Sequence, residues 1–152
     1  MDKLKINCAL QISRPVKEVF EAIIDPEKMA NYFIEKGSGR MAEGKELEWK
    51  FPEFEEKAMV KVIELTPDEY VSFQWEGAAG EKLLVEITLL EMPGDATLVK
   101  VTEGEMKFDE KGVKWLAQNT EGWANFLACM KAYLEYGINL RKGAFDFMRP
   151  AT

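Results

Sequence analysis

The sequence contains no histidine, and this absence removes several classes of site. Without an imidazole there is no Ser-His-Asp or Cys-His nucleophile pair and no zinc or iron site that uses histidine ligands. No remaining side chain titrates near neutral pH at its ordinary pKa. We therefore predict no cofactor and no metal, and we expect function to depend on shape, aromatic contacts and a few polar groups.

Cysteine is scarce, and long apolar runs are absent. Cys8 and Cys129 are the two cysteines, and they are too far apart for a metal knuckle or a redox pair. We predict that both are small buried hydrophobic residues. The first residues have no continuous apolar stretch of the kind found in a signal peptide, and nowhere do about 20 apolar residues follow one another. We expect a cytoplasmic protein that does not insert into membranes.

Positive charge is also in short supply. The chain has 20 Lys and Arg against 27 Asp and Glu, which gives a net charge of -7. Nucleic-acid binding depends on clustered positive side chains, so this balance argues against a nucleic-acid partner. The length of 152 residues is typical of one domain with its own apolar core. We predict a single domain over residues 1–152.

Alternating apolar residues predict most of the strands. Leu4 to Ile12 alternate strictly, after which Ser13 can cap a helix that has Pro15 in its first turn. A second short helix is expected over 27–33. Further alternation predicts strands over 47–51, 59–65, 71–76, 83–89 and 96–103, with turns that include residues 77–80. Short connections without helices make these strands an antiparallel meander.

The last long segment changes to the period of a helix. Leu116, Trp123, Leu127, Met130 and Leu134 recur on one face of a helix of about 20 residues or more. A sheet of this many strands twists, so we expect it to curl around this helix. The segment 143–148 is too apolar for a solvated end, and we expect it to dock on the domain or on a second subunit.

Several stretches resemble a known superfamily, in its order along the chain. They are 12–20 with 25–27, 64–67 with 71–75, 102–104, and 121–127. Together they resemble the helix-grip superfamily of START-like, polyketide-cyclase and birch-pollen-allergen-like proteins (SRPBCC), and most of all the activator of heat-shock protein 90 ATPase homologue-like family. This resemblance implies an α+β helix-grip fold, in which a curved antiparallel sheet of six to seven strands wraps around a long C-terminal helix. It also implies two short helices after the first strand.

An aromatic set is the best candidate for a ligand site. If the apolar face of the sheet lines a cavity, these side chains would enclose a small flat or acyl ligand in roughly 300 to 1,000 Å³. Ordinary core packing remains the alternative. The candidate ligand-binding residues are Tyr32, Phe33, Trp49, Phe51, Phe73, Trp75, Leu116, Asn119, Trp123 and Leu127. Asn119 matters most among the polar candidates, because a buried amide needs a partner.

Charged candidates are expected to lie at the surface. Arg14 and Arg40 could pair with a ligand carboxylate or phosphate, but surface ion pairs are the simpler expectation. The carboxylate groups Glu103 with Glu105, and Glu53 with its neighbours Glu55 and Glu56, could serve acid and base chemistry. In a chain so rich in carboxylates we expect solvated faces instead.

The sequence leaves three candidate functions. The first is binding of a small hydrophobic or amphipathic molecule between sheet and helix, without catalysis. The second, implied by the resemblance, is a protein-interaction role as a chaperone partner or regulator. The third is a cyclase- or hydrolase-type enzyme that uses a carboxylate. A monomer and a homodimer both remain open.

Overall fold

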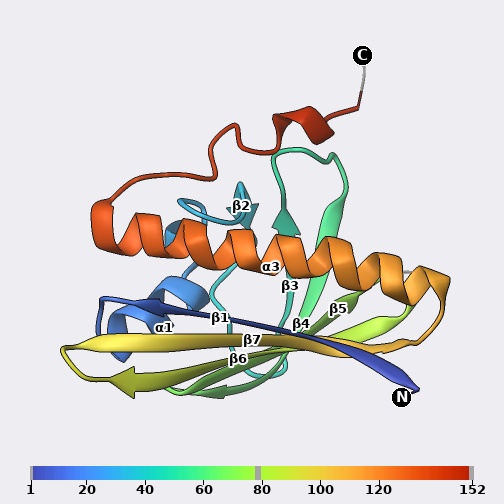
Figure 1. Cartoon of the computed structure of the whole chain (residues 1–152). Helices are drawn as coiled ribbons and strands as arrows, with labels where there is room; N and C mark the ends of the chain where they lie inside the picture. The colour runs from blue at the N-terminus through green and yellow to red at the C-terminus, as the bar shows by residue number, and fades with distance from the viewer. Residues whose placement is uncertain (1, 78–79, 151–152) are drawn as a thin grey trace.

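A curved antiparallel sheet crossed by one long helix forms the body of the protein (Figure 1). The computed structural model describes residues 2–77 and 80–150. The strands are β1 (Lys3–Ile12), β2 (Lys36–Gly37), β3 (Glu46–Lys50), β4 (Lys57–Thr66), β5 (Tyr70–Glu76), β6 (Lys82–Met92) and β7 (Ala96–Lys107). They are ordered β1-β7-β6-β5-β4-β3-β2. The helices are α1 (Val16–Ile24), α2 (Pro26–Met29), α3 (Glu110–Tyr136) and the short 3-10 helix η2 (Asp146–Met148). The helix-grip fold predicted from the sequence is confirmed.

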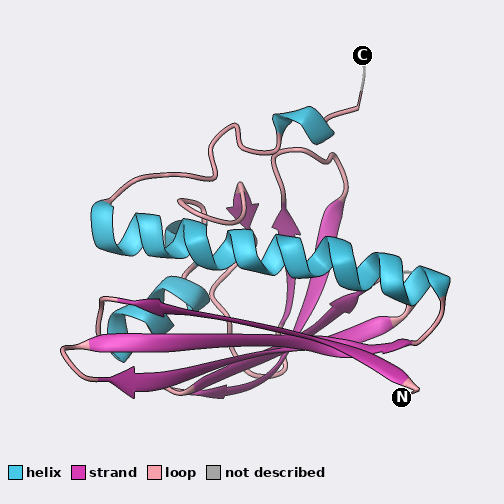
Figure 2. Ribbon diagram, in the orientation of Figure 1, coloured by secondary structure: helices cyan, strands magenta, loops and turns pink. Residues whose placement is uncertain are grey.

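The strand pattern places one apolar face against the helices. In β6, Leu83, Val85, Ile87 and Leu89 are buried and the residues between them are half-buried, as expected for side chains on alternate faces of a strand. Figure 2 shows α3 lying across this sheet, with α1 beneath one end of it. The apolar core therefore lies between the sheet and the helices.

The two short helices differ in detail from the prediction. The first begins at Val16 after Pro15, and no side chain caps it. Ser13 does not serve as its cap; its backbone N–H donates instead to the Glu135 carboxylate at 2.8 Å. The second helix ends at Met29 rather than at residue 33. The Asn31 amide donates to the carbonyls of residues 27 and 28, which satisfies helix-end acceptors and favours the turn that follows.

The long helix has clear signals at both ends. The Asp109 side chain accepts a hydrogen bond from the Gly112 N–H at 2.8 Å, and Gly137 ends the helix with a φ of 66°. Along the predicted stripe, Trp123, Leu127 and Met130 are buried, and the other two members are half-buried. No helix in the described part of the chain is long and apolar enough to cross a membrane.

The segment after α3 turns back toward the connection between β3 and β4 (Figure 1). This C-terminal segment, residues 137–150, lies beside that connection because Arg141 bonds to Glu53 there. Of the two cysteines, Cys129 is buried and Cys8 is half-buried, and both are free thiols. Burial raises the pKa of each thiol. Within the predicted turn at 77–80, residues 78 and 79 lie outside the described residues.

Candidate ligand-binding pocket

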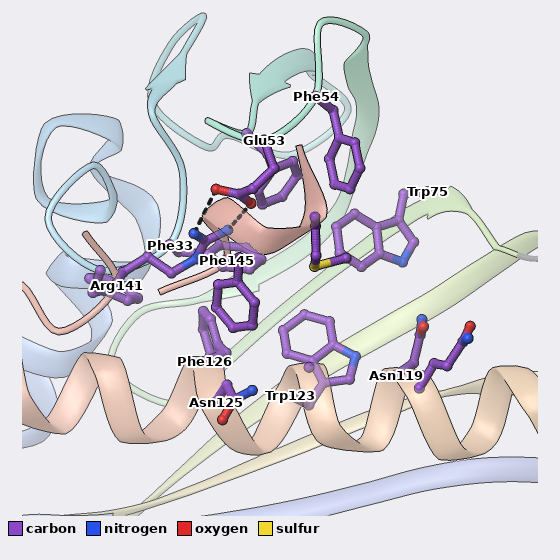
Figure 3. Close-up of a pocket in the computed structure, with 15 residues that line it drawn as sticks. Phe33, Glu53, Phe54, Trp75, Asn119, Trp123, Asn125, Phe126, Arg141 and Phe145 are labelled. Carbon is purple, nitrogen blue, oxygen red and sulfur yellow. Dashed lines mark hydrogen bonds and ion pairs between the residues drawn. The ribbon is translucent and has the colours of Figure 1, made fainter. Parts of the chain in front are cut away.

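A pocket of about 240 Å³ opens where α3, the β3–β4 connection and the C-terminal segment meet (Figure 3). Its volume is somewhat below the expected range. Eight of its lining side chains are aromatic: Tyr32, Phe33, Phe51, Phe54, Trp75, Trp123, Phe126 and Phe145. The other lining residues are Glu53, Gln118, Asn119, Gly122, Asn125, Arg141 and Met148. The walls are thus mostly aromatic, with amides on the helix side and one ion pair at the rim.

The aromatic rings contact one another around the pocket. Trp75 and Trp123 have ring centroids 5.7 Å apart, so the space directly between these two indoles is filled. Phe126 packs edge-on against Phe33 at 4.7 Å and against Trp123 at 5.1 Å. Tilted and edge-on pairs at such distances contribute about 0.5–1.5 kcal/mol beyond their buried area. The rings therefore hold each other in place.

A buried carboxylate supports the two indoles. Glu103 on β7 is 0% exposed. Its oxygens accept hydrogen bonds from Trp75 Nε1 at 2.8 Å, from Trp123 Nε1 at 2.8 Å and from Asn119 Nδ2 at 3.2 Å. These three donors come from β5 and α3. The carboxylate therefore joins the sheet to the long helix and orients both tryptophans.

An ion pair closes the rim of the pocket. Arg141 donates from both terminal nitrogens to Glu53, at 2.9 and 2.6 Å. The Glu53 side chain is 3% exposed and that of Arg141 is 14% exposed. The same guanidinium lies over the Phe145 ring, 4.4 Å from its centroid. These contacts fix the C-terminal segment against the β3–β4 connection.

Tyr32 contributes a neutral hydroxyl group beside the pocket. This residue is fully buried, and its Oη donates to the Ala22 carbonyl at 2.8 Å. Burial raises the pKa of Tyr32 well above its ordinary value, and the neighbouring Tyr133 raises it further. The Tyr32 ring stacks on Tyr133 at 5.9 Å. The tyrosine therefore acts as a fixed wall of the pocket.

The structure brings six of the ten predicted ligand residues to the pocket wall. These six are Tyr32, Phe33, Phe51, Trp75, Asn119 and Trp123. The other four do not line the pocket: Trp49, Phe73 and Leu127 are buried in the core, and Leu116 is half-buried against it. Trp49 contacts Phe73 at 5.2 Å and Trp75 at 6.2 Å, so it packs behind the wall.

The expectation that the paired carboxylates are solvated is wrong for two of them. Glu103 is buried because it continues the inward-facing set of Val99 and Val101 on β7. The register shift comes after it, where Lys5 pairs with Gly104 and Leu4 with Met106. Glu105 falls in this irregularity and is exposed. Glu53 is buried by Arg141, whereas Glu55 and Glu56 are exposed. Both buried carboxylates have nitrogen donors as partners, which is the usual condition for burying charge.

The arginines expected near the cavity lie elsewhere. Arg40 forms a two-pronged surface ion pair with Glu21, and this contact lowers the pKa of Glu21. Arg14 donates to the carbonyls of Leu134 and Glu135 at the end of α3. Arg141 is the arginine at the pocket, and sequence reasoning missed it because its partner is 88 positions away.

Other pocket residues were also missed. Gln118, Gly122, Asn125 and Phe126 line the pocket from α3 together with the predicted Asn119. From Gln118 through Asn119 to Phe126, the spacing of one, three, three and one places these residues on one helix face, next to the apolar stripe. This polar and aromatic face was readable in the sequence. Phe145 and Met148 were not, because nothing local shows where a segment after a helix will return.

A second hollow adjoins the pocket on the far side of Asn119. Its volume is about 370 Å³, and Glu76, Lys111, Lys114 and Trp115 are among the residues that line it. Both lysines are exposed. Charged walls of this kind suit water better than an apolar ligand. The aromatic pocket is therefore the stronger candidate for a binding site.

Comparison with known proteins places the fold. A family model described as "Activator of Hsp90 ATPase homolog 1-like protein" matches residues 13–135. A solved structure from Staphylococcus saprophyticus is 30% identical, with a TM-score of 0.76, over 89% of this chain and 94% of that one. No curated protein matches the chain significantly.

Two further solved structures show the same architecture. DynU16, a protein from the dynemicin biosynthetic locus, is 26% identical with a TM-score of 0.77. The match covers 89% of this chain and 48% of DynU16, so the chain spans about half of that protein. The Aha1 dimer of Colwellia psychrerythraea is 20% identical with a TM-score of 0.76, over 88% of this chain and 98% of that one. At this identity, the last likeness concerns the fold alone.

Proposed function

The chain belongs to the activator of Hsp90 ATPase homolog 1-like family, and on this scaffold we propose that it binds a small apolar or amphipathic molecule in the aromatic pocket. The observation that carries the proposal is the pocket itself: about 240 Å³ lined by eight aromatic side chains and three amides. Mostly apolar walls with a few fixed polar groups are typical of small-molecule sites. The amides of Gln118, Asn119 and Asn125 supply the polar groups here, and the bond to Glu103 fixes the amide of Asn119.

The arrangement favours binding over catalysis. Three N–H donors already occupy Glu103, and two of them belong to the indoles that line the pocket. Glu53 is held by both terminal nitrogens of Arg141. A general base must reach the proton that it removes. These two carboxylates would have to give up existing bonds to do so.

The test is a substitution that fills the pocket and leaves the apolar core unchanged. A Cβ added at Gly122 meets no atom within 4 Å, yet this residue lines the pocket. Gly122→Leu should therefore fill the space, and Ala124→Leu, on the exposed side of the same helix, is the matched control. We expect the neutral fluorescent probe N-phenylnaphthylamine to bind the native protein and Ala124→Leu, and to lose at least about tenfold in affinity for Gly122→Leu. Equal binding by all three proteins would place the probe elsewhere, and no binding to the native protein would contradict the proposal.

A chaperone partner is the second candidate function. It is supported by the family and by exposed apolar side chains near the C-terminus: Tyr136 is 69% exposed and Phe147 is 81% exposed. Exposed apolar groups of this size often mark contact surfaces. The test is a pull-down and an ATPase assay with the host's Hsp90 homologue, comparing the native chain with Phe147→Ala. Neither association nor a change in ATPase rate would reject this role.

Self-association is a separate question that one measurement answers. The Aha1 neighbour from Colwellia psychrerythraea is a dimer, and the same exposed C-terminal side chains could serve a second copy of this chain. Sedimentation velocity over a range of protein concentrations distinguishes monomer from dimer. A dimer that Phe147→Ala weakens would assign the surface to self-association.

A further inference from the structure

The charge beneath the aromatic pocket is not balanced by a cation. Glu103 accepts three hydrogen bonds, all from neutral groups. No Lys or Arg among the described residues forms an ion pair with it. An environment of donors without acceptors matches an ionised carboxylate, which can only accept hydrogen bonds. A fully buried negative charge therefore lies directly behind the pocket wall.

This charge acts on the pocket through its hydrogen-bond donors. Trp75, Asn119 and Trp123 all line the pocket and all donate to Glu103. Figure 3 shows the nitrogen of each indole on the side nearer Asn119, and the six-membered rings toward Phe145. An indole face already carries partial negative charge. When the indole N–H donates to an anion, the negative charge on this face increases.

The other charges at the pocket do not cancel this one. Glu53 and Arg141 neutralise each other through two hydrogen bonds. Counting Glu53, Arg141 and Glu103 leaves one negative charge in excess. Lys111 and Lys114 border the neighbouring hollow, but they are exposed, and water and salt screen exposed charges. The net charge of -7 adds a long-range attraction for cations.

Resting on the proposed function, we propose that the pocket selects a ligand with a positively charged group, such as a quaternary ammonium or a protonated amine attached to a flat apolar body. The cation lies against the indole faces of Trp75 and Trp123, where a ring attracts positive charge and little water intervenes. An anion is repelled by Glu103, and Arg141 is already bound to Glu53. A fatty acid or another carboxylate is thereby disfavoured.

The test uses three ligands on the native protein that share a phenylalkyl body and differ in the charge of the end group. They are phenylbutyl-trimethylammonium, its neutral tert-butyl isostere and phenylbutyrate, each followed by tryptophan fluorescence and by calorimetry. We expect the cation to bind about tenfold more tightly than the neutral isostere, and the anion to bind most weakly. A neutral or anionic ligand that binds as tightly as the cation would overturn the inference and leave the proposed function intact. Failure of all three to bind would count against the proposed function itself.

Substitutions at Glu103 and Glu53, with Glu105→Gln as the control, test whether these charges cause the selectivity. Glu103→Gln should reduce the preference for the cation to less than about threefold, whereas Glu105→Gln, an exposed site on the same strand, should preserve it. Glu53→Gln leaves the Arg141 guanidinium without its carboxylate partner. This variant should therefore bind the cation more weakly and phenylbutyrate more tightly than the native protein does. If Glu103→Gln does not fold, as judged by circular dichroism, Glu53→Gln and the native series decide the matter. A preference that persists in folded Glu103→Gln, or that Glu53→Gln leaves unchanged, would overturn the role given to these charges.

Discussion

The Glu103 carboxylate and the Trp123 indole are joined by a 2.8 Å hydrogen bond, and no part of Glu103 is exposed to solvent. Trp75 donates to the other oxygen of the same carboxylate at the same distance. The two tryptophans come from different layers, one from β5 and one from α3. One buried residue thus links the sheet to the helix and lies behind the pocket wall.

We expect Glu103→Gln to destabilise the fold. A glutamine side chain has one acceptor oxygen and an NH₂ group, so at least one of the three donors would face a nitrogen. Leaving a buried donor without a partner costs about 1–3 kcal/mol. Urea unfolding followed by tryptophan fluorescence measures the change. Glu105→Gln removes the same charge from an exposed site and should change the free energy of unfolding by less than about 0.5 kcal/mol. Equal losses in the two variants would contradict this prediction.

We expect Arg141→Gln to release the C-terminal segment. The substitution removes the two bonds to Glu53 and the contact with Phe145, while the sheet and α3 keep their own packing. Local opening then exposes the aromatic residues of this segment, and chymotrypsin should cleave within 137–150 about tenfold faster. Mass spectrometry of timed samples locates the cut. The control is Lys142→Gln, an exposed neighbour in the same segment. Cleavage at the same rate in both variants would show that the contacts of Arg141 do not hold this segment in place.

The stability provided by Glu135 should depend on pH. Burial raises the pKa of Glu135, but hydrogen bonds from Lys131 and from the Ser13 N–H outweigh burial and hold the pKa below its ordinary value. A lowered pKa in the folded state stabilises the protein above the ordinary value, and this contribution disappears as the pH falls through the folded value. Glu135→Gln should therefore cost about 1 kcal/mol near pH 7, and the difference should shrink below about pH 4. Urea unfolding at several pH values checks this. Glu121→Gln, exposed on the same helix, should show little difference at any pH.

Two glycines of α3 should respond in opposite ways to alanine. A Cβ on Gly112 would lie 2.0 Å from the Lys107 carbonyl oxygen, so Gly112→Ala must shift the backbone and should lose at least about 2 kcal/mol. A Cβ on Gly122 meets no atom within 4 Å. Since alanine favours helix over glycine by about 1 kcal/mol, Gly122→Ala should be neutral or stabilising. Thermal unfolding of the two variants compares them, and a loss at Gly122 as large as that at Gly112 would contradict the open space at that position.

The sequence allowed the fold to be predicted because its strands and long helix have strong local periodicity. Alternation in β1 and β6, and the stripe through Trp123 and Met130, depend only on neighbours in the chain. The ends of the helices were harder to predict. Helix α2 stops just before Asn31, whose side-chain amide donates to a backbone carbonyl of that helix. Such a side-chain bond competes with helix continuation and has no periodic signal.

The site was predicted only in part, and the reason is again physical. Aromatic type and helix phase led to Trp75, Asn119 and Trp123, all of which line the pocket. Neither property shows that Glu103 is buried, since a carboxylate on the inner face of β7 needs donors from two other elements, β5 and α3. Arg141 joins Glu53 only after the chain has turned back on itself. Charges whose partners are distant in sequence were therefore assigned to the surface by default.

Three pocket residues, Arg141, Phe145 and Met148, belong to the segment that follows α3. The sheet and the long helix are complete before this segment begins, so changes within it alter the binding wall with little cost to the core. The fold thus separates the residues that stabilise the core from part of the pocket wall. A library confined to 138–150 would test whether the proposed ligand preference can be altered on an unchanged scaffold.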